Sequence, residues 1–124
     1  MPNVLIVEDD PVASDLLELV LLRLPGVSVR TLPSVEAARV ALASEEQFDA
    51  VITDVHLPGE DGLSLIAWLR QLPRRQGTPV IVTTSSREPG IRSRAEAMGV
   101  RAFIQKPWSA SSLRDTVHSL FNET

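Results

Sequence analysis

The stretch FDAVITDVHLPG, residues 48–59, decides the fold of this 124-residue chain. Residues 50–53 form a short apolar run that is typical of a buried strand, and the Pro-Gly pair at 58–59 predicts a turn after it. Between strand and turn stands Asp54, a carboxylate whose burial costs free energy unless a partner or a chemical role compensates it. We therefore take Asp54 as the centre around which the remaining chain is arranged.

Four further apolar runs of strand length accompany this one, and helical patterns separate them. The predicted strands are residues 4–7, 27–32, 50–53, 79–83 and 101–105, and the predicted helices follow at about 11–24, 34–44, 63–72, 91–98 and 110–121. Alternation of this kind predicts a parallel sheet with helices on both faces. The expected fold class is a doubly wound α/β domain with five strands. Residues 1–124 fit a single domain with no output domain.

Polar side chains stand where four of the predicted strands end. Glu8 and Asp9 follow the first strand, Asp54 the third, Thr84 the fourth and Lys106 the fifth. In open parallel sheets, ligands bind beyond the carboxyl ends of the strands. We therefore expect these five residues to meet at one edge of the sheet, although they are far apart in the sequence.

Composition argues against several classes of protein. A net charge of -4 gives no basic face for nucleic acid, and the absence of cysteine excludes disulfides and cysteine-ligated metals. No signal peptide is visible, and the longest apolar stretch, residues 16–24, is short and contains Glu18 and Arg23. The expectation is a cytoplasmic protein that binds neither membrane nor nucleic acid directly.

The expected meeting of three carboxylates points to a metal site. Glu8, Asp9 and Asp54 would repel one another at close range, and a hard divalent cation removes that conflict. We expect Mg²⁺ on the side chains of Asp9 and Asp54, with Glu8 binding directly or through water. A backbone carbonyl just after Asp54, that of His56, would complete the set.

The same residues suit phosphoryl transfer. A carboxylate such as Asp54 can attack phosphorus and form an aspartyl phosphate, and the transfer needs positive charge around the phosphoryl oxygens. We expect Mg²⁺, the Lys106 ammonium and the Thr84 hydroxyl to take one oxygen each. Lys106 is the only lysine among 12 basic residues, and the Lys106-Pro107 bond is a candidate cis peptide.

Taken together, these residues resemble the receiver domain of two-component response regulators over the whole chain. The resemblance rests on motifs spread along the sequence: Val4 to Pro11, Asp54 with residues 57–59 and 61–62, Thr84-Ser85, and residues 99–103 leading to Lys106-Pro107. It implies a flavodoxin-like strand order, 2-1-3-4-5. It also implies a signalling module rather than an enzyme, with no chemistry beyond accepting and slowly losing a phosphoryl group.

The resemblance further implies partners and a response. Asp54 would receive its phosphoryl group from a sensor histidine kinase or a histidine phosphotransfer protein. Thr84 and Phe103 would form a switch pair, in which the hydroxyl moves toward the phosphoryl group and the aromatic ring follows it. The surface of the fourth helix, fifth strand and fifth helix would then change for a downstream effector or a homodimer.

Simpler explanations stand beside these roles. Asp54 could be a helix cap or an ion-pair partner, Thr84 a loop residue, Phe103 a core aromatic and His56 a surface residue. One alternative for the whole chain is an interaction module of the same fold that is never phosphorylated. A remote alternative is a haloacid-dehalogenase-type phosphatase, but that class needs an aspartate where His56 stands.

The first predicted helix carries apolar residues on two sides. The residues predicted to face the core are Ala13, Leu16, Leu17, Val20 and Leu24, whereas Val12, Leu19 and Leu22 fall outside that face. An outward apolar stripe often marks a partner surface. We hypothesise that a helical bundle of the phosphodonor docks on this stripe; partial burial by neighbouring loops is the alternative.

Overall fold

The computed structural model describes residues 2–122; residues 1, 123 and 124, which the single-domain prediction includes, lie outside the described residues. Within that range the strands β1 (Asn3–Val7), β2 (Ser28–Leu32), β3 (Ala50–Asp54), β4 (Val80–Thr84) and β5 (Ala102–Gln105) form one sheet. All neighbouring strands run parallel, in the order β2-β1-β3-β4-β5. The predicted parallel sheet is confirmed, and so is the strand order that the resemblance implied.

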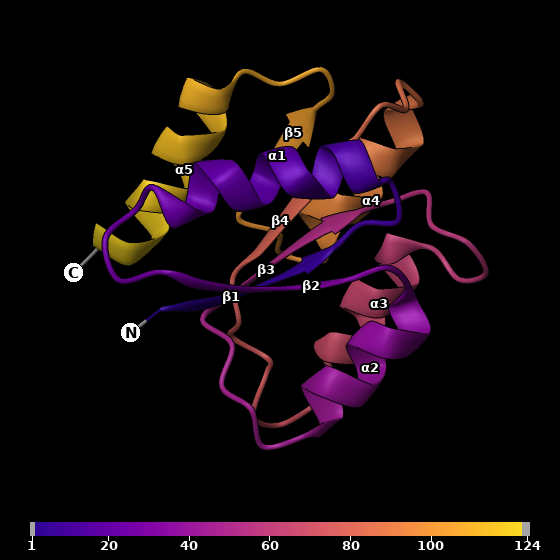
Figure 1. The fold of residues 1–124 in the computed structure, drawn as a ribbon. Helices are drawn as coiled ribbons and strands as arrows, with labels where there is room; N and C mark the ends of the chain where they lie inside the picture. Colours follow the sequence, from indigo (N-terminus) through magenta and orange to yellow (C-terminus); the bar gives the residue numbers. More distant parts are fainter. Residues whose placement is uncertain (1, 123–124) are drawn as a thin grey trace.

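Helices cover both faces of this sheet (Figure 1). One face carries α1 (Pro11–Leu22) and α5 (Ala110–Asn122), and the other carries α2 (Val35–Ala43), α3 (Gly62–Leu69) and α4 (Pro89–Ala97). The doubly wound arrangement is therefore confirmed. In the part of the chain that the structure describes, no helix is long and apolar enough to cross a membrane.

The core consists of two buried clusters, one on each side of the sheet. Side chains alternate along β1, so that Val4 and Ile6 pack toward α1 and α5 while Leu5 and Val7 pack toward the other helices. The inner strands read as continuous apolar runs because both of their faces are covered. Burial of these clusters fixes the strands, and the strands in turn fix the polar residues at their carboxyl ends.

The buried face of α1 differs from the prediction at Leu16 and Leu21. Ala13, Leu17 and Val20 are buried as expected, but Leu16 is 47% exposed and Leu21 is fully buried instead. With about 3.6 residues per turn, Leu21 lies one turn beyond Leu17 on the buried stripe, whereas Leu16 lies at the margin of that stripe. The expectation that Leu16 faces the core was therefore wrong.

Helix ends follow signals in the sequence. Asp10 is the N-cap of α1, where its Oδ1 accepts a hydrogen bond from the Val12 amide at 3.2 Å, and a proline occupies the first turn. Gly99, just beyond α4, has a φ of 73°, a left-handed conformation that glycine adopts without strain. The Lys106-Pro107 peptide bond is cis, as hypothesised.

Candidate functional site

Strand β3 brings Asp54 to the middle of the carboxyl edge of the sheet, because β1 and β4 flank it on either side. The residue is buried, with 8% of its surface exposed. Its Oδ1 accepts a hydrogen bond from the Val55 amide at 2.7 Å, and its Oδ2 accepts one from Lys106 Nζ at 3.2 Å. The carboxylate is thus held in one orientation at the base of the site.

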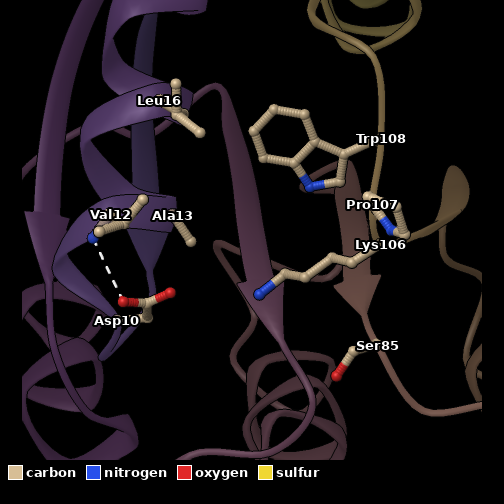
Figure 2. Close-up of a pocket in the computed structure, with 8 residues that line it drawn as sticks. All are labelled: Asp10, Val12, Ala13, Leu16, Ser85, Lys106, Pro107 and Trp108. Atoms are coloured by element: carbon tan, nitrogen blue, oxygen red, sulfur yellow. Dashed lines mark hydrogen bonds between the residues drawn. The ribbon is translucent and has the colours of Figure 1, made fainter.

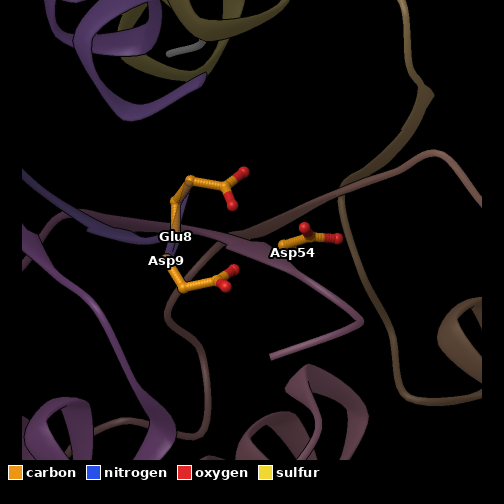
Figure 3. Close-up of side chains that lie close together, drawn as sticks. All are labelled: Glu8, Asp9 and Asp54. Carbon is orange, nitrogen blue, oxygen red and sulfur yellow. The ribbon is translucent and has the colours of Figure 1, made fainter. Parts of the chain in front are cut away.

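Glu8 and Asp9 follow the adjacent strand β1, and their carboxylates lie near that of Asp54 (Figure 3). One carboxylate oxygen from each of the three residues lies within 4.8 Å of the other two. Glu8 is buried and Asp9 is exposed. Three oxygen donors of like charge suit a hard divalent cation. The structure therefore brings together the three acidic residues that the sequence singled out.

Lys106, just beyond β5, lies among these carboxylates. Its Nζ donates to Glu8 Oε1 at 2.7 Å as well as to Asp54 Oδ2. Burial by itself would lower the pKa of Lys106, but the hydrogen bond to Glu8 and the two negative charges outweigh burial and raise that pKa. Burial raises the pKa of Glu8, and the hydrogen bond from Lys106 opposes that rise only in part. Sequence analysis placed Lys106 at the site but missed its contact with Glu8.

The two residues expected to act as a switch lie on neighbouring strands, β4 and β5. Thr84 is buried, and its Oγ1 accepts a hydrogen bond from the Ser86 amide at 3.1 Å, so its hydroxyl is engaged at the start of its own loop. Phe103 is half-buried against the core, and the guanidinium carbon of Arg92 lies 5.4 Å from the centre of its ring. Their switching role stays a prediction.

His56 lies in the loop between β3 and α3, where the chain leaves Asp54. Its imidazole is exposed, in agreement with the simpler expectation of a surface residue. The use of its backbone carbonyl as a metal ligand stays a prediction.

A cavity of about 310 Å³ adjoins the site on the side of α1 (Figure 2). One wall is formed by α1, including the exposed Leu16, and the opposite wall by the segment after β5, including Trp108. The lining residues are Asp10, Val12, Ala13, Leu16, Ser85, Lys106, Pro107 and Trp108. Sequence analysis missed this cavity because it assigned Leu16 to the core.

Fold and site together define a class of protein: a doubly wound α/β domain with a buried aspartate, two further acids and a lysine at the carboxyl edge of its sheet. The profile of the response regulator receiver domain matches residues 4–118. The chain therefore belongs to the response regulator receiver family. It is a signalling module rather than a true enzyme, and its acidic pocket is consistent with a phosphoacceptor switch.

The relatives include parts of long proteins as well as short ones. The chain is 36% identical to the sensory/regulatory protein RpfC of Xanthomonas campestris over 94% of its own length, but it spans only 16% of RpfC. It is 29% identical to the polar-differentiation response regulator DivK of Brucella ovis, with 98% of this chain and 97% of DivK covered.

Solved structures show the same fold. The chemotaxis response regulator CheY4 of Vibrio cholerae has a TM-score of 0.85 and 25% identity, with 97% of this chain and 98% of that chain covered. The response regulator Rcp1, solved in its Mn(2+)-bound form, has a TM-score of 0.86 and 24% identity, with 100% of this chain and 98% of that chain covered.

Proposed function

We propose that Asp54 accepts a phosphoryl group in a Mg²⁺-dependent switch of a two-component phosphorelay. An Asp54 oxygen bonds to phosphorus while the phosphorus–nitrogen bond to the donor's phosphohistidine breaks and leaves its electrons on the imidazole. The observation that carries this proposal is the buried Asp54 carboxylate, which lies beside two further carboxylates and the Lys106 ammonium. Such crowding of charge opposes folding, and it is typical of a functional site.

Glu8, Asp9, Asp54 and the backbone carbonyl of His56 would hold the metal ion. When bound, Mg²⁺ neutralises the carboxylates and withdraws charge from the phosphoryl oxygens. The approach of three carboxylates within 4.8 Å supports a divalent cation at this place. That the response regulator Rcp1 has been solved in a Mn(2+)-bound form agrees with a divalent cation in this family. Lys106, now bonded to Glu8 and Asp54, would direct its ammonium to a phosphoryl oxygen.

The response to phosphorylation would begin at Thr84. Its hydroxyl would leave the Ser86 amide and donate to the phosphoryl group, and the ring of Phe103 would follow inward. Arg92, on α4, lies over that ring, so a shift of Phe103 would change a contact with α4. The surface formed by α4, β5 and α5 would then bind a downstream effector or a second copy of this chain.

Membership of the family implies a histidine kinase as the phosphodonor. We propose that a sensor histidine kinase or a histidine phosphotransfer protein docks with a helix on α1. Val12, Leu19 and Leu22 are exposed there, and Leu16 extends their stripe to the cavity beside Trp108. A partner that buried this stripe would gain hydrophobic free energy next to the site.

We further propose that residues 1–124 act as a single receiver unit in the cytoplasm, with no output domain among them and no direct contact with nucleic acid or membrane. The net charge of -4 supports the absence of a nucleic-acid footprint. Signals would leave the domain through its protein partners.

Intact mass spectrometry tests the phosphoacceptor role. The protein is incubated with acetyl phosphate or phosphoramidate and Mg²⁺, in parallel with Asp54→Ala and with a sample that contains a chelator. A phosphate-sized gain in mass is expected only for the unaltered protein with Mg²⁺. No gain with either donor would favour the alternative, an interaction module that is never phosphorylated.

A second experiment tests the docking surface on α1. Leu19→Ser with Leu22→Ser should slow transfer from a phosphorylated histidine phosphotransfer protein while phosphorylation by phosphoramidate continues at the original rate. Val40→Ser is the matched control, because Val40 is 74% exposed on α2, which covers the other face of the sheet. Equal slowing with both donors would disprove docking on α1.

A further inference from the structure

The loop of residues 55–61 joins Asp54 to α3 and carries His56. Both of its ends are fixed by the backbone: the Gly62 amide donates to Val55 O at 2.8 Å, and Gly62 packs directly on the Asp54 carbonyl. Between these ends, Leu57 packs partly buried against the core while His56 is exposed. The middle of the loop therefore depends on few contacts for its position.

One of those contacts reaches across to α2. Glu60 accepts two hydrogen bonds from the guanidinium of Arg39, at 2.6 Å and 2.9 Å, in a paired geometry that holds both carboxylate oxygens. Arg39 in turn lies over the indole of Trp68 on α3, with its guanidinium carbon 5.6 Å from the ring centre. Within residues 2–122, the buried Nε of Arg39 has no hydrogen-bond partner, so the pair with Glu60 is the polar contact that the guanidinium makes.

Two contacts hold the Arg39 guanidinium: the ring of Trp68 and the carboxylate of Glu60. The guanidinium lies over the ring of Trp68, and its planar fork of N–H groups matches both oxygens of the Glu60 carboxylate. The side chains of Arg39 and Glu60 are 33% and 40% exposed, so solvent weakens the attraction but does not cancel the geometric restraint.

We propose that the Arg39–Glu60 ion pair positions the loop of residues 55–61 so that its backbone presents the His56 carbonyl to a divalent cation held by Asp54 and its acidic neighbours. This role rests on the function proposed above and makes Arg39 and Glu60 positioning residues, since neither touches the reacting atoms. The pair lets α2 and α3 stabilise a loop that belongs to the site.

The direction in which two substitutions change the affinity for Mg²⁺ distinguishes a positioning role from an effect of charge alone. If Arg39 acted only through its charge, Arg39→Gln would make the site more negative and tighten Mg²⁺ binding, whereas Glu60→Gln would weaken it. If the pair positions the loop, each substitution releases the same restraint and weakens binding. The double substitution should then weaken binding no more than either single one, because the restraint can be lost only once.

Isothermal titration calorimetry of the phosphate-free protein with Mg²⁺ measures these changes in affinity. For Arg39→Gln, Glu60→Gln and the double variant, the Kd for Mg²⁺ should rise by roughly two- to five-fold, the range expected for a partly exposed ion pair. Arg30→Gln is the matched control, because it breaks another arginine–glutamate pair, Arg30 with Glu46, and removes the same charge. Its Kd should stay close to that of the unaltered protein.

Two results would overturn the proposal alone: an unchanged Kd in all variants, or opposite changes for Arg39→Gln and Glu60→Gln. Failure of the unaltered protein to bind Mg²⁺ would overturn it together with the metal site of the proposed function. Urea unfolding of each variant accompanies the titration, and we expect every variant to remain folded because the pair lies at the surface.

Discussion

The loop between β3 and α3 and the loop between β4 and α4 each follow a strand that ends at a predicted site residue, yet they are held differently. In the first, Gly62 packs on the backbone of Asp54, and Asp61 caps α3 by accepting a hydrogen bond from the Ser64 amide at 2.8 Å. Glu60 adds an ion pair with α2. The helix that follows buries a nearly continuous face, comprising Gly62, Leu63, Leu65, Ile66 and Leu69.

The unit of β4 and α4 has fewer restraints. Glu88 occupies the N-cap position of α4 without a side-chain capping hydrogen bond, and the buried residues of α4 are Ile91 and Ala95. Its loop is tied to β5 by Gln105 Nε2, which donates to Ser86 O at 2.7 Å. Segments with few buried contacts open at a low cost in free energy.

The two units beside the site therefore differ in how firmly they are held. The first unit holds Asp54, the proposed phosphoacceptor, in place, and the second unit would rearrange at a lower cost in free energy because it buries fewer residues. The comparison supports the proposal that the response runs from Thr84 to α4. Substitutions in the two units and at Lys106 test this comparison.

The largest effect should come from adding a methyl group where Gly62 packs against the backbone of Asp54. A Cβ at position 62 would lie 2.0 Å from the Asp54 carbonyl oxygen, so Gly62→Ala must displace the backbone and should cost about 3 kcal/mol of unfolding free energy. Gly90→Ala is the control in α4, where a Cβ meets nothing within 4 Å, and it should be neutral or stabilise by up to about 1 kcal/mol. Urea unfolding measures both. Equal losses would mean that the two units are equally tight.

The effect of Lys106→Met on the unfolding free energy should be the next largest and should depend on pH. It leaves Glu8 and Asp54 without their counter-charge, at a cost of about 2 kcal/mol near neutral pH. Because the pKa of Glu8 is already raised above 4.5, its proton favours the folded state, and that stabilisation is lost as the pH rises through the folded pKa. The loss of unfolding free energy in Lys106→Met should therefore grow as the pH rises from 4.5.

Urea unfolding at a series of pH values, in the presence of a chelator, measures this deficit. The unaltered protein keeps the stabilisation from Lys106 between neutral pH and 10.5, where the lysine and the carboxylates are both charged. It loses that stabilisation as the pH rises through the pKa of Lys106, which is raised above 10.5. A deficit that is constant between acid and neutral pH would show that the carboxylates do not depend on Lys106.

Substitution of the two N-cap residues should give a smaller difference in unfolding free energy between the two units. Asp61→Ala deletes the hydrogen bond to the Ser64 amide and should lower the unfolding free energy by about 1 kcal/mol. Glu88→Ala removes a residue whose side chain makes no capping bond and should change it by less than about 0.5 kcal/mol. Thermal or urea unfolding compares them, and a larger loss for Glu88→Ala would contradict the comparison.

The smallest effect should follow from Gln105→Ala, which frees the loop after β4 from β5. Loss of one hydrogen bond at a partly exposed site should speed amide hydrogen exchange at residues 85–88 by roughly two- to five-fold. Exchange at residues 55–61 should stay unchanged and serves as the internal control. Faster exchange in both loops would show that they move together.

Much of this molecule could be predicted from local patterns. Short apolar runs and the helical periodicity between them gave the doubly wound sheet, because burial on both faces demands such runs. Asp54 and Lys106 were recognisable because each stands at the carboxyl end of a strand, and parallel strands end at a common edge. Asp10 and Gly99 marked helix ends through the chemistry of caps.

Contacts between distant side chains were decided only by the tertiary structure. The bond from Lys106 to Glu8 joins residues 98 positions apart, and the pair of Arg39 with Glu60 joins residues 21 apart. Leu16 has the same apolar character as its buried neighbours, and only the packing around α1 turned it toward the cavity beside Trp108. A sequence determines which residues reach the edge of the sheet, because periodicity is local. Which partner each one meets depends on how the helices and loops pack around it, and no local pattern carries that information.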